Sequence, residues 1–84
     1  MSKVTVADVR QILENDFPWA TLPKTDEKLL KMDLIYDFEF DSMDVAELSD
    51  VIQEKYGVSV NYLNEKTEKF RRDSTIENYI EMFE

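Results

Sequence analysis

The chain contains a single glycine, Gly57, and two prolines, Pro18 and Pro23, in 84 residues. Folds made of many short strands need tight turns, and those turns use Gly and Pro more than other residues. The scarcity of both favours long helices, and a chain of this length has room for one modest core. We therefore expect an all-α fold with a single domain over residues 1–84, a small helical bundle with three main helices and one short helix.

Two residue types that carry much of protein chemistry, Cys and His, are absent from the chain. Their absence excludes zinc fingers, thiol catalysis and Ser-His triads, and it predicts a protein that is not an enzyme and holds no metal. No apolar run is long enough to cross a bilayer, so no membrane span is expected. The N-terminal stretch lacks the apolar segment of a signal peptide, which favours a cytoplasmic protein, with a monomer as the default.

The charge of the chain is strongly negative, with 19 acidic and 10 basic side chains and a net charge of −9. Such a charge opposes binding to nucleic acid and to anionic lipid, and it favours partners with basic surfaces. Residues 33–56 hold eight acidic side chains and one basic one. Most of the negative field is therefore expected around this segment.

The first helix is predicted to begin after Thr5, because Thr5 and Asp8 have the spacing of a capping box. The apolar residues that follow have the three-and-four spacing of one helix face: Val6, Val9, Leu13 and Phe17, with Ile12 on the flank. Pro18 ends the helix. In the connector that follows, Trp19 and Leu22 are expected to pack over one end of the core.

The central helix is the most regular segment, because Asp41 is a good N-cap and Gly57 a good stop. At 100° per residue, one face gathers the apolar core residues Val45, Leu48, Val51, Ile52 and Tyr56. The opposite face gathers Met43, Glu47, Asp50 and Glu54. The second set predicts an exposed stripe that starts beside Ser42.

The segments on either side of the central helix give weaker patterns. Before it, a short helical turn is expected among Leu29, Leu30, Leu34, Ile35 and Phe38. After it, a short helix is expected within residues 58–73, where the candidate core residues are Val58, Val60, Tyr62, Leu63 and Phe70. A last helix is predicted from the capping-box pair Ser74 and Glu77, with one apolar face made of Ile76, Tyr79, Ile80 and Phe83.

Residues 34–60, LIYDFEFDSMDVAELSDVIQEKYGVSV, resemble the centre of acyl carrier proteins, in which an Asp-Ser-Leu motif opens the second helix. Here Asp41-Ser42-Met43 occupies that place. The similarity continues through Asp44, Glu47 and Leu48 along the helix, and residues 74–83, STIENYIEMF, resemble the last helix of the family. The resemblance implies an acyl-carrier-like helical bundle over nearly the whole chain.

The resemblance also implies a function, that of a discrete acyl carrier protein. In the family the serine hydroxyl receives phosphopantetheine from coenzyme A, so Ser42 is the expected attachment site and Asp41 part of its motif. The expected partners are a phosphopantetheinyl transferase and acyl-transferring or synthase enzymes with basic docking surfaces. The expected docking residues on the carrier are Met43, Asp44, Glu47, Asp50 and Glu54.

The chain departs from the family pattern at four places, one of which is a longer segment between Val60 and Ile76. Many carriers have Gly shortly before the motif, where this chain has Phe38-Glu39-Phe40; Met43 replaces the usual Leu; and Asn61 stands at a common Pro. These differences favour a specialised fatty acid or polyketide-type pathway over a housekeeping fatty-acid carrier. The alternatives left open are an aminoacyl, peptidyl or D-alanyl carrier, or an unmodified acidic helical adaptor in which Ser42 only starts the helix.

A calcium-binding loop is a further hypothesis, because Asp37, Glu39 and Asp41 alternate as EF-hand ligands do. It fails at two positions of that loop. Ser42 stands where the loop needs Gly, and Leu48 stands where it needs the bidentate Glu. A calcium sensor is therefore not expected.

Overall fold

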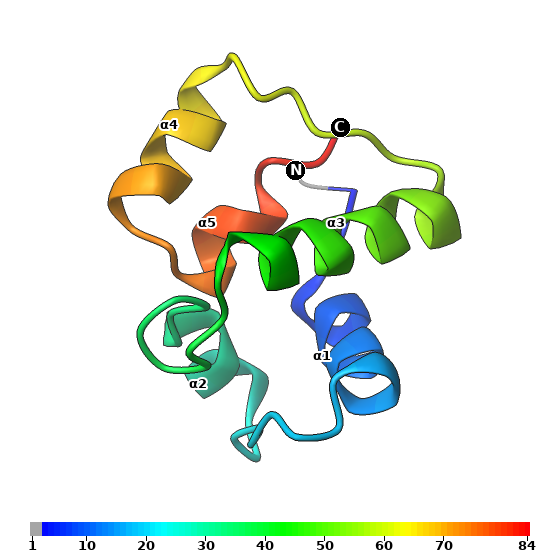
Figure 1. Ribbon diagram of the computed structural model, residues 1–84, viewed down its shortest axis with the longest axis vertical. Coiled ribbons are helices and arrows are strands. Elements are labelled where there is room, and N and C mark those ends of the chain that lie inside the picture. Colours follow the sequence, from blue (N-terminus) through cyan, green and yellow to red (C-terminus); the bar gives the residue numbers. More distant parts are fainter. Residues whose placement is uncertain (1–2) are drawn as a thin grey trace.

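Five helices make up the regular structure of the described part of the chain, residues 3–84 of a computed structural model (Figure 1). In chain order they are α1 (Val6–Asp16), α2 (Asp26–Lys31), α3 (Ser42–Tyr56), α4 (Glu65–Arg72) and α5 (Ile76–Ile80). Residues 3–84 contain no strand, only two isolated bridges, Asp33 with Thr75 and Val60 with Phe83. The expected all-α class is confirmed at this level, as a small helical protein.

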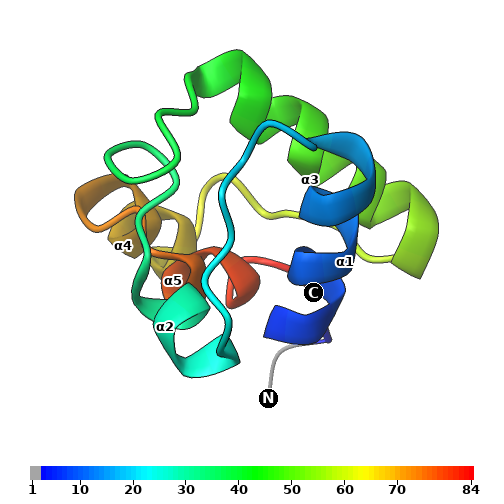
Figure 2. The same ribbon diagram turned by 90° about the horizontal axis from the view of Figure 1, so that it is seen from below.

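The helices surround one apolar core. Helix α1 packs against α2, α3 and α5, and α5 also packs against α2 and α4. Figures 1 and 2 show α3 lying across the molecule over α1 and α5. The radius of gyration of 11.6 Å matches the value of roughly 12 Å for a folded chain of this length. No helix within residues 3–84 has the length and apolar character needed to cross a membrane.

The first helix begins and ends as its sequence predicts. The Asp8 N–H donates to the Thr5 hydroxyl at 3.2 Å and the Thr5 N–H donates to the Asp8 carboxylate at 3.0 Å, which completes the capping box. Pro18 follows the C-cap Phe17. Val9, Ile12 and Leu13 are the buried residues of α1. Ile12 therefore belongs to the buried face of the helix and not to the flank of that face.

Helix α3 also has the predicted ends. Asp41 is its N-cap, and Gly57 takes the left-handed conformation, with φ 65°, at its C-cap. Because L side chains rarely adopt that conformation, the only glycine of the chain is used where it is needed. Leu48 and Ile52 are fully buried, while Val45, Val51 and Tyr56 are half-buried against the core.

Several predictions outside α1 and α3 are wrong in detail. Tyr62 is 54% and Leu63 is 96% exposed, because the loop before α4 runs over the surface. Trp19 packs edge-on against the buried Phe17 ring at 5.3 Å and Leu22 is half-buried against the core, as expected, although 64% of Trp19 is exposed. Ser74 does not cap the last helix: the N-cap is Thr75, and the Ser74 hydroxyl donates to the Phe70 carbonyl.

The expected count of three main helices is also wrong. The last helix, α5, spans only five residues, and α4 is longer at eight. The predicted apolar set is nevertheless buried, since Ile76, Tyr79 and Ile80 lie in α5 and Phe83 just beyond it. The C-terminal end is held by the Val60–Phe83 bridge instead of a longer helix, with backbone hydrogen bonds between Ser59 and Glu84.

The backbone is strained at Glu39, whose φ is 58°. Glu39 lies between Phe38 and Phe40, which are both buried, and its own side chain is exposed. The left-handed conformation costs an L-residue about 1–2 kcal/mol, and Gly adopts it without that cost. The chain therefore accepts strain here to place both rings in the core.

Replacement of Glu39 by Gly is expected to stabilise the protein. The relief of strain exceeds the extra chain entropy of Gly, so the free energy of unfolding should rise by about 0.5–1 kcal/mol. Urea denaturation measures this change. Glu39→Ala is the matched control, because it removes the same charge and keeps Cβ; an equal gain in that variant would assign the effect to charge and not to the backbone.

Candidate functional site

The loop before α3 is held by carboxylates that bind its own backbone. The Asp33 side chain accepts hydrogen bonds from the N–H groups of Ile35 (2.8 Å) and Tyr36 (3.0 Å). The Asp37 side chain accepts from the Asp33 N–H at 2.7 Å. These hydrogen bonds fix the conformation of the loop that leads into the first turn of α3, and so they fix the position of Ser42.

Ser42 is the first residue of α3, and its side chain is exposed. Asp41 accepts the Asp44 N–H at 2.9 Å on its side chain and the Val45 N–H at 3.1 Å on its carbonyl. The cap leaves the N–H groups of Ser42 and Met43 without a partner inside the helix. The Ser42 hydroxyl has no hydrogen-bond partner within residues 3–84. A free hydroxyl therefore stands at the positive end of a helix dipole.

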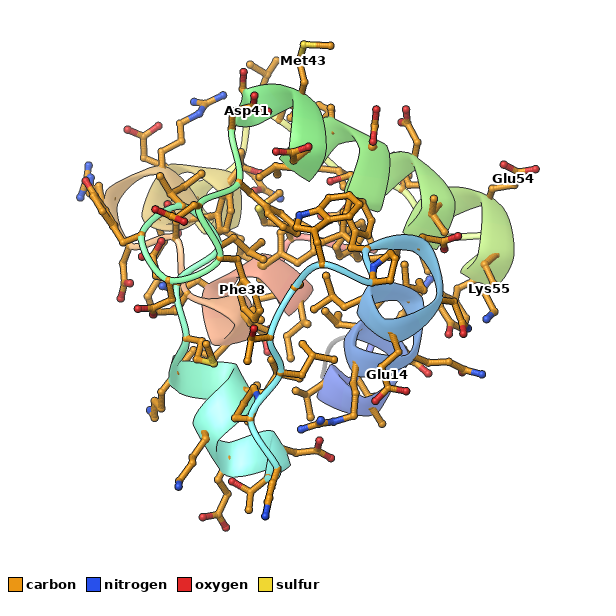
Figure 3. The ribbon with its side chains drawn as sticks, turned by 60° about the horizontal axis from the view of Figure 1, so that its bottom comes forward. Glu14, Phe38, Asp41, Met43, Glu54 and Lys55 are labelled. Carbon is orange, nitrogen blue, oxygen red and sulfur yellow. The ribbon has the colours of Figure 1, made fainter. Side chains whose placement is uncertain are left out.

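The predicted exposed stripe of α3 is confirmed as a surface feature. Met43 is 72% exposed, and Glu47, Asp50 and Glu54 are exposed along the same helix. None of these carboxylates forms a salt bridge with a Lys or Arg in residues 3–84. Figure 3 shows Met43 and Glu54 near the two ends of α3, directed away from the body of the molecule. Their charges are available to a basic partner.

Asp44 differs from the other predicted docking residues. Its carboxylate accepts the Asp41 N–H at 3.2 Å, which completes a second capping box, and its side chain is only half-exposed. Asp41 and Asp44 thus stabilise the start of α3 through hydrogen bonds to each other's backbone. The structure gives both a local structural role beside Ser42.

A pocket of about 430 Å³ lies beside Ser42, between α3 and α4. We name it the Ser42 pocket. Its walls are formed by Ile35, Ser42, Val45, Ala46, Ser49, Tyr62, Thr67, Phe70, Arg71, Ser74 and Met82. Ser49, Thr67, Phe70 and Met82 are buried, whereas Ser42, Tyr62 and Arg71 are exposed. The exposed residues therefore mark the mouth, with Ser42 among them.

Two hydroxyl groups meet in the core behind the Ser42 pocket. The Ser49 oxygen lies 2.7 Å from the Tyr79 hydroxyl, and the Ser49 hydroxyl donates to the Val45 carbonyl, also at 2.7 Å. A serine hydroxyl has one proton, so Tyr79 is the donor in the pair. Burial raises the pKa of the Tyr79 hydroxyl well above its ordinary value.

This raised pKa predicts a loss of stability in alkali. Below about pH 10 Tyr79 is protonated in the folded and the unfolded chain alike. Above it, the unfolded chain releases the proton and the folded chain does not. The free energy of unfolding should therefore fall by up to roughly 1.4 kcal/mol per pH unit through this group. Denaturation curves from pH 8 to 11 measure the slope, which should be shallower in Tyr79→Phe; an unchanged slope would contradict the assignment.

A second pocket, of about 550 Å³, shares no wall residue with the Ser42 pocket. It is formed by Leu30, Lys66, Lys69, Glu77, Asn78, Ile80 and Glu81. Two lysines and two glutamates line it, so its positive and negative charges balance. Glu77 also pairs with Lys31 at 2.7 Å. The walls therefore present no single charge to a ligand.

The acidic side chains form no metal site in the described chain. Within residues 3–84 no group of three or more Asp, Glu, His or Cys side chains is placed to hold a metal ion. Asp37 and Asp41, which alternate with Glu39 in the sequence, bind backbone N–H groups through their carboxylates. The alternation therefore produces loop and cap hydrogen bonds.

The candidate site thus combines an exposed serine at a helix start, an acidic helix face and a pocket beside the serine. Comparison of the chain with models of known protein families, with curated protein sequences and with solved structures found no match.

The sequence interpretation missed the wall of the Ser42 pocket. Ser49 lies on the inner side of α3, between the buried residues Leu48 and Ile52. A polar residue on a buried helix face is a signal, readable in the sequence, that its hydroxyl has a partner inside the protein. Its partner Tyr79 is 30 residues away in the chain, and Thr67 comes from α4. No spacing in the sequence indicates that these residues share one pocket with Ser42.

Proposed function

We propose that the chain is a discrete acyl carrier protein that holds thioester-linked cargo on a phosphopantetheine arm attached to Ser42. The observation that carries the proposal is the exposed, unbonded Ser42 hydroxyl at the first turn of α3. A transferase can reach such a hydroxyl. Free N–H groups and the helix dipole at the same turn favour the phosphodiester anion that the transfer produces.

The surroundings of Ser42 support this proposal. The stripe of Met43, Glu47, Asp50 and Glu54 presents one large apolar group next to the attachment point and three unpaired carboxylates along the same helix. Such a surface gives fast encounters with basic partner enzymes, as a shuttling carrier needs. The thiol that carries the cargo belongs to the arm, so a protein without Cys or His can do this work.

Many acyl carrier proteins have Gly in the segment where this chain has Glu39, but this difference is only a weak argument against the proposal. Glu39 has a φ of 58°, which is a backbone conformation that Gly adopts without strain. The loop can therefore take a glycine-like path although it has no glycine. Met43 in place of Leu keeps a large exposed apolar side chain next to Ser42.

The direct test is the intact mass of the protein after incubation with coenzyme A and a phosphopantetheinyl transferase. We expect the mass to increase by one phosphopantetheine group, with fragmentation placing it on Ser42. Both a broad-specificity transferase and one from the protein's own source should be used. If neither modifies the folded chain, the carrier proposal is wrong and an unmodified acidic adaptor replaces it.

A further inference from the structure

The buried wall of the Ser42 pocket contains hydroxyl groups as well as hydrocarbon. Ser49 and Thr67 are each only 3% exposed, and both line the pocket together with the half-buried Ser74. Buried polar groups in a small pocket give orientation and specificity to what binds there. The direction of their hydrogen bonds therefore decides which ligand chemistry the wall accepts.

The protons of these hydroxyl groups are already used by backbone carbonyls. Ser49 donates to the Val45 carbonyl at 2.7 Å, and Ser74 donates to the Phe70 carbonyl at 3.1 Å. Thr67 donates to a carbonyl of the loop before α4. A hydroxyl has one proton and two lone pairs, so what remains at each oxygen is the ability to accept.

The lone pairs are only partly occupied. Ser49 accepts one hydrogen bond, from Tyr79, which leaves one lone pair. Within residues 3–84 no donor is bound to the hydroxyl oxygen of Thr67 or Ser74. The donors of the wall, the Arg71 guanidinium and the hydroxyls of Ser42 and Tyr62, belong to exposed residues at the mouth, where Arg71 pairs with Glu68. The interior of the pocket thus offers acceptors and lacks free donors.

We propose that the Ser42 pocket selects cargo that carries a hydrogen-bond donor, namely a hydroxyacyl group, over the corresponding oxoacyl or plain acyl group. The inference rests on the proposed carrier function, which supplies the reason for an acyl group beside Ser42. A hydroxyl on the cargo donates to the free lone pair of Ser49. An oxo group in the same place meets only acceptors, and its own buried oxygen is left without a partner.

The test uses free N-acetylcysteamine thioesters and the unmodified protein, so it does not depend on modification of Ser42. Three kinds of probe of one length are compared: hexanoyl, hydroxyhexanoyl with the hydroxyl at carbon 3, 4 or 5, and the matching oxohexanoyl. Dissociation constants come from amide chemical-shift titrations. At one hydroxyl position or more, we expect the hydroxy probe to bind tightest and about two- to tenfold more tightly than its oxo counterpart.

Two variants form a matched pair of controls. Ser49→Ala and Tyr79→Phe both remove the hydrogen bond between the two side chains, and Ser49→Ala costs more stability because it leaves the buried Tyr79 hydroxyl without an acceptor. Only Ser49→Ala removes the acceptor in the wall. We expect it to abolish the preference for the hydroxy probe, whereas Tyr79→Phe retains the preference because the Ser49 oxygen is still present.

Three results would overturn the proposal. The first is that no hydroxyl position improves binding in the parent, or that the hexanoyl probe binds tightest, which would make the pocket a simple apolar one. The second is a preference that survives in Ser49→Ala. The third is a preference that disappears once the arm is attached with its thiol free, because amide N–H groups of the arm would then occupy the acceptors. Failure of the carrier function itself is a separate result, read from the intact mass.

Discussion

Replacement of Ser42 by Ala should abolish modification completely while leaving the fold nearly unchanged. The hydroxyl is the only group at this turn that can form the phosphodiester, since Met43 is a thioether and a carboxylate such as Asp41 or Asp44 would give an acyl phosphate instead. Ala is a better helix former than Ser, and exposed substitutions usually change stability by less than about 0.5 kcal/mol. Intact mass after reaction with coenzyme A and a transferase measures the first effect, and thermal denaturation the second.

The control for this experiment is Ser59→Ala, which changes another exposed serine outside the helices. It should gain the same mass as the parent. A mass gain in Ser42→Ala would place the arm on a different residue and contradict the site. A large loss of stability in Ser42→Ala would instead show that the Ser42 hydroxyl has a structural role that the free hydroxyl does not indicate.

Neighbouring residues on α3 should respond in opposite ways to the introduction of Lys. Leu48 is fully buried, so Leu48→Lys places an unpaired charge in the core and is expected to unfold the domain. Leu48→Ala makes the effect measurable, with an expected loss of about 2–5 kcal/mol. Glu47 is exposed and forms no ion pair within residues 3–84, so Glu47→Lys should change stability by less than about 0.5 kcal/mol.

The effect of Glu47→Lys should appear in the rate of modification. Reversing a charge beside Ser42 weakens the attraction of a basic transferase, so the association rate should fall, and fall most at low salt. Glu14→Lys is the matched control, because Glu14 is exposed on α1, away from Met43 (Figure 3). Equal slowing by the two variants would assign the effect to net charge and not to the stripe. Equal losses of stability at Glu47 and Leu48 would mean that the helix faces the core differently.

The ends of α1 and α3 could be predicted from the sequence because they depend on near neighbours. The capping boxes of Thr5 with Asp8 and of Asp41 with Asp44 join residues three apart, and each can form as soon as its helix starts. The stop at Gly57 is equally local, because only its backbone freedom is involved. For the same reason the faces of α3, and with them the exposure of Ser42 and its stripe, follow from the period of the helix.

Features that join distant parts of the chain could not be predicted from the sequence. Three such features depend on how α3, α4 and α5 are placed relative to one another. They are the exposure of Tyr62 and Leu63, the burial of Ser49 against Tyr79, and the wall of the Ser42 pocket. Ser74 shows the same limit on a small scale. It has the local pattern of a helix cap, yet its carbonyl accepts the Leu34 N–H and its hydroxyl donates to Phe70, so Thr75 begins α5. Contacts between distant segments outweigh local preference there, because the local pattern can be satisfied in more than one way and the packed core in only one.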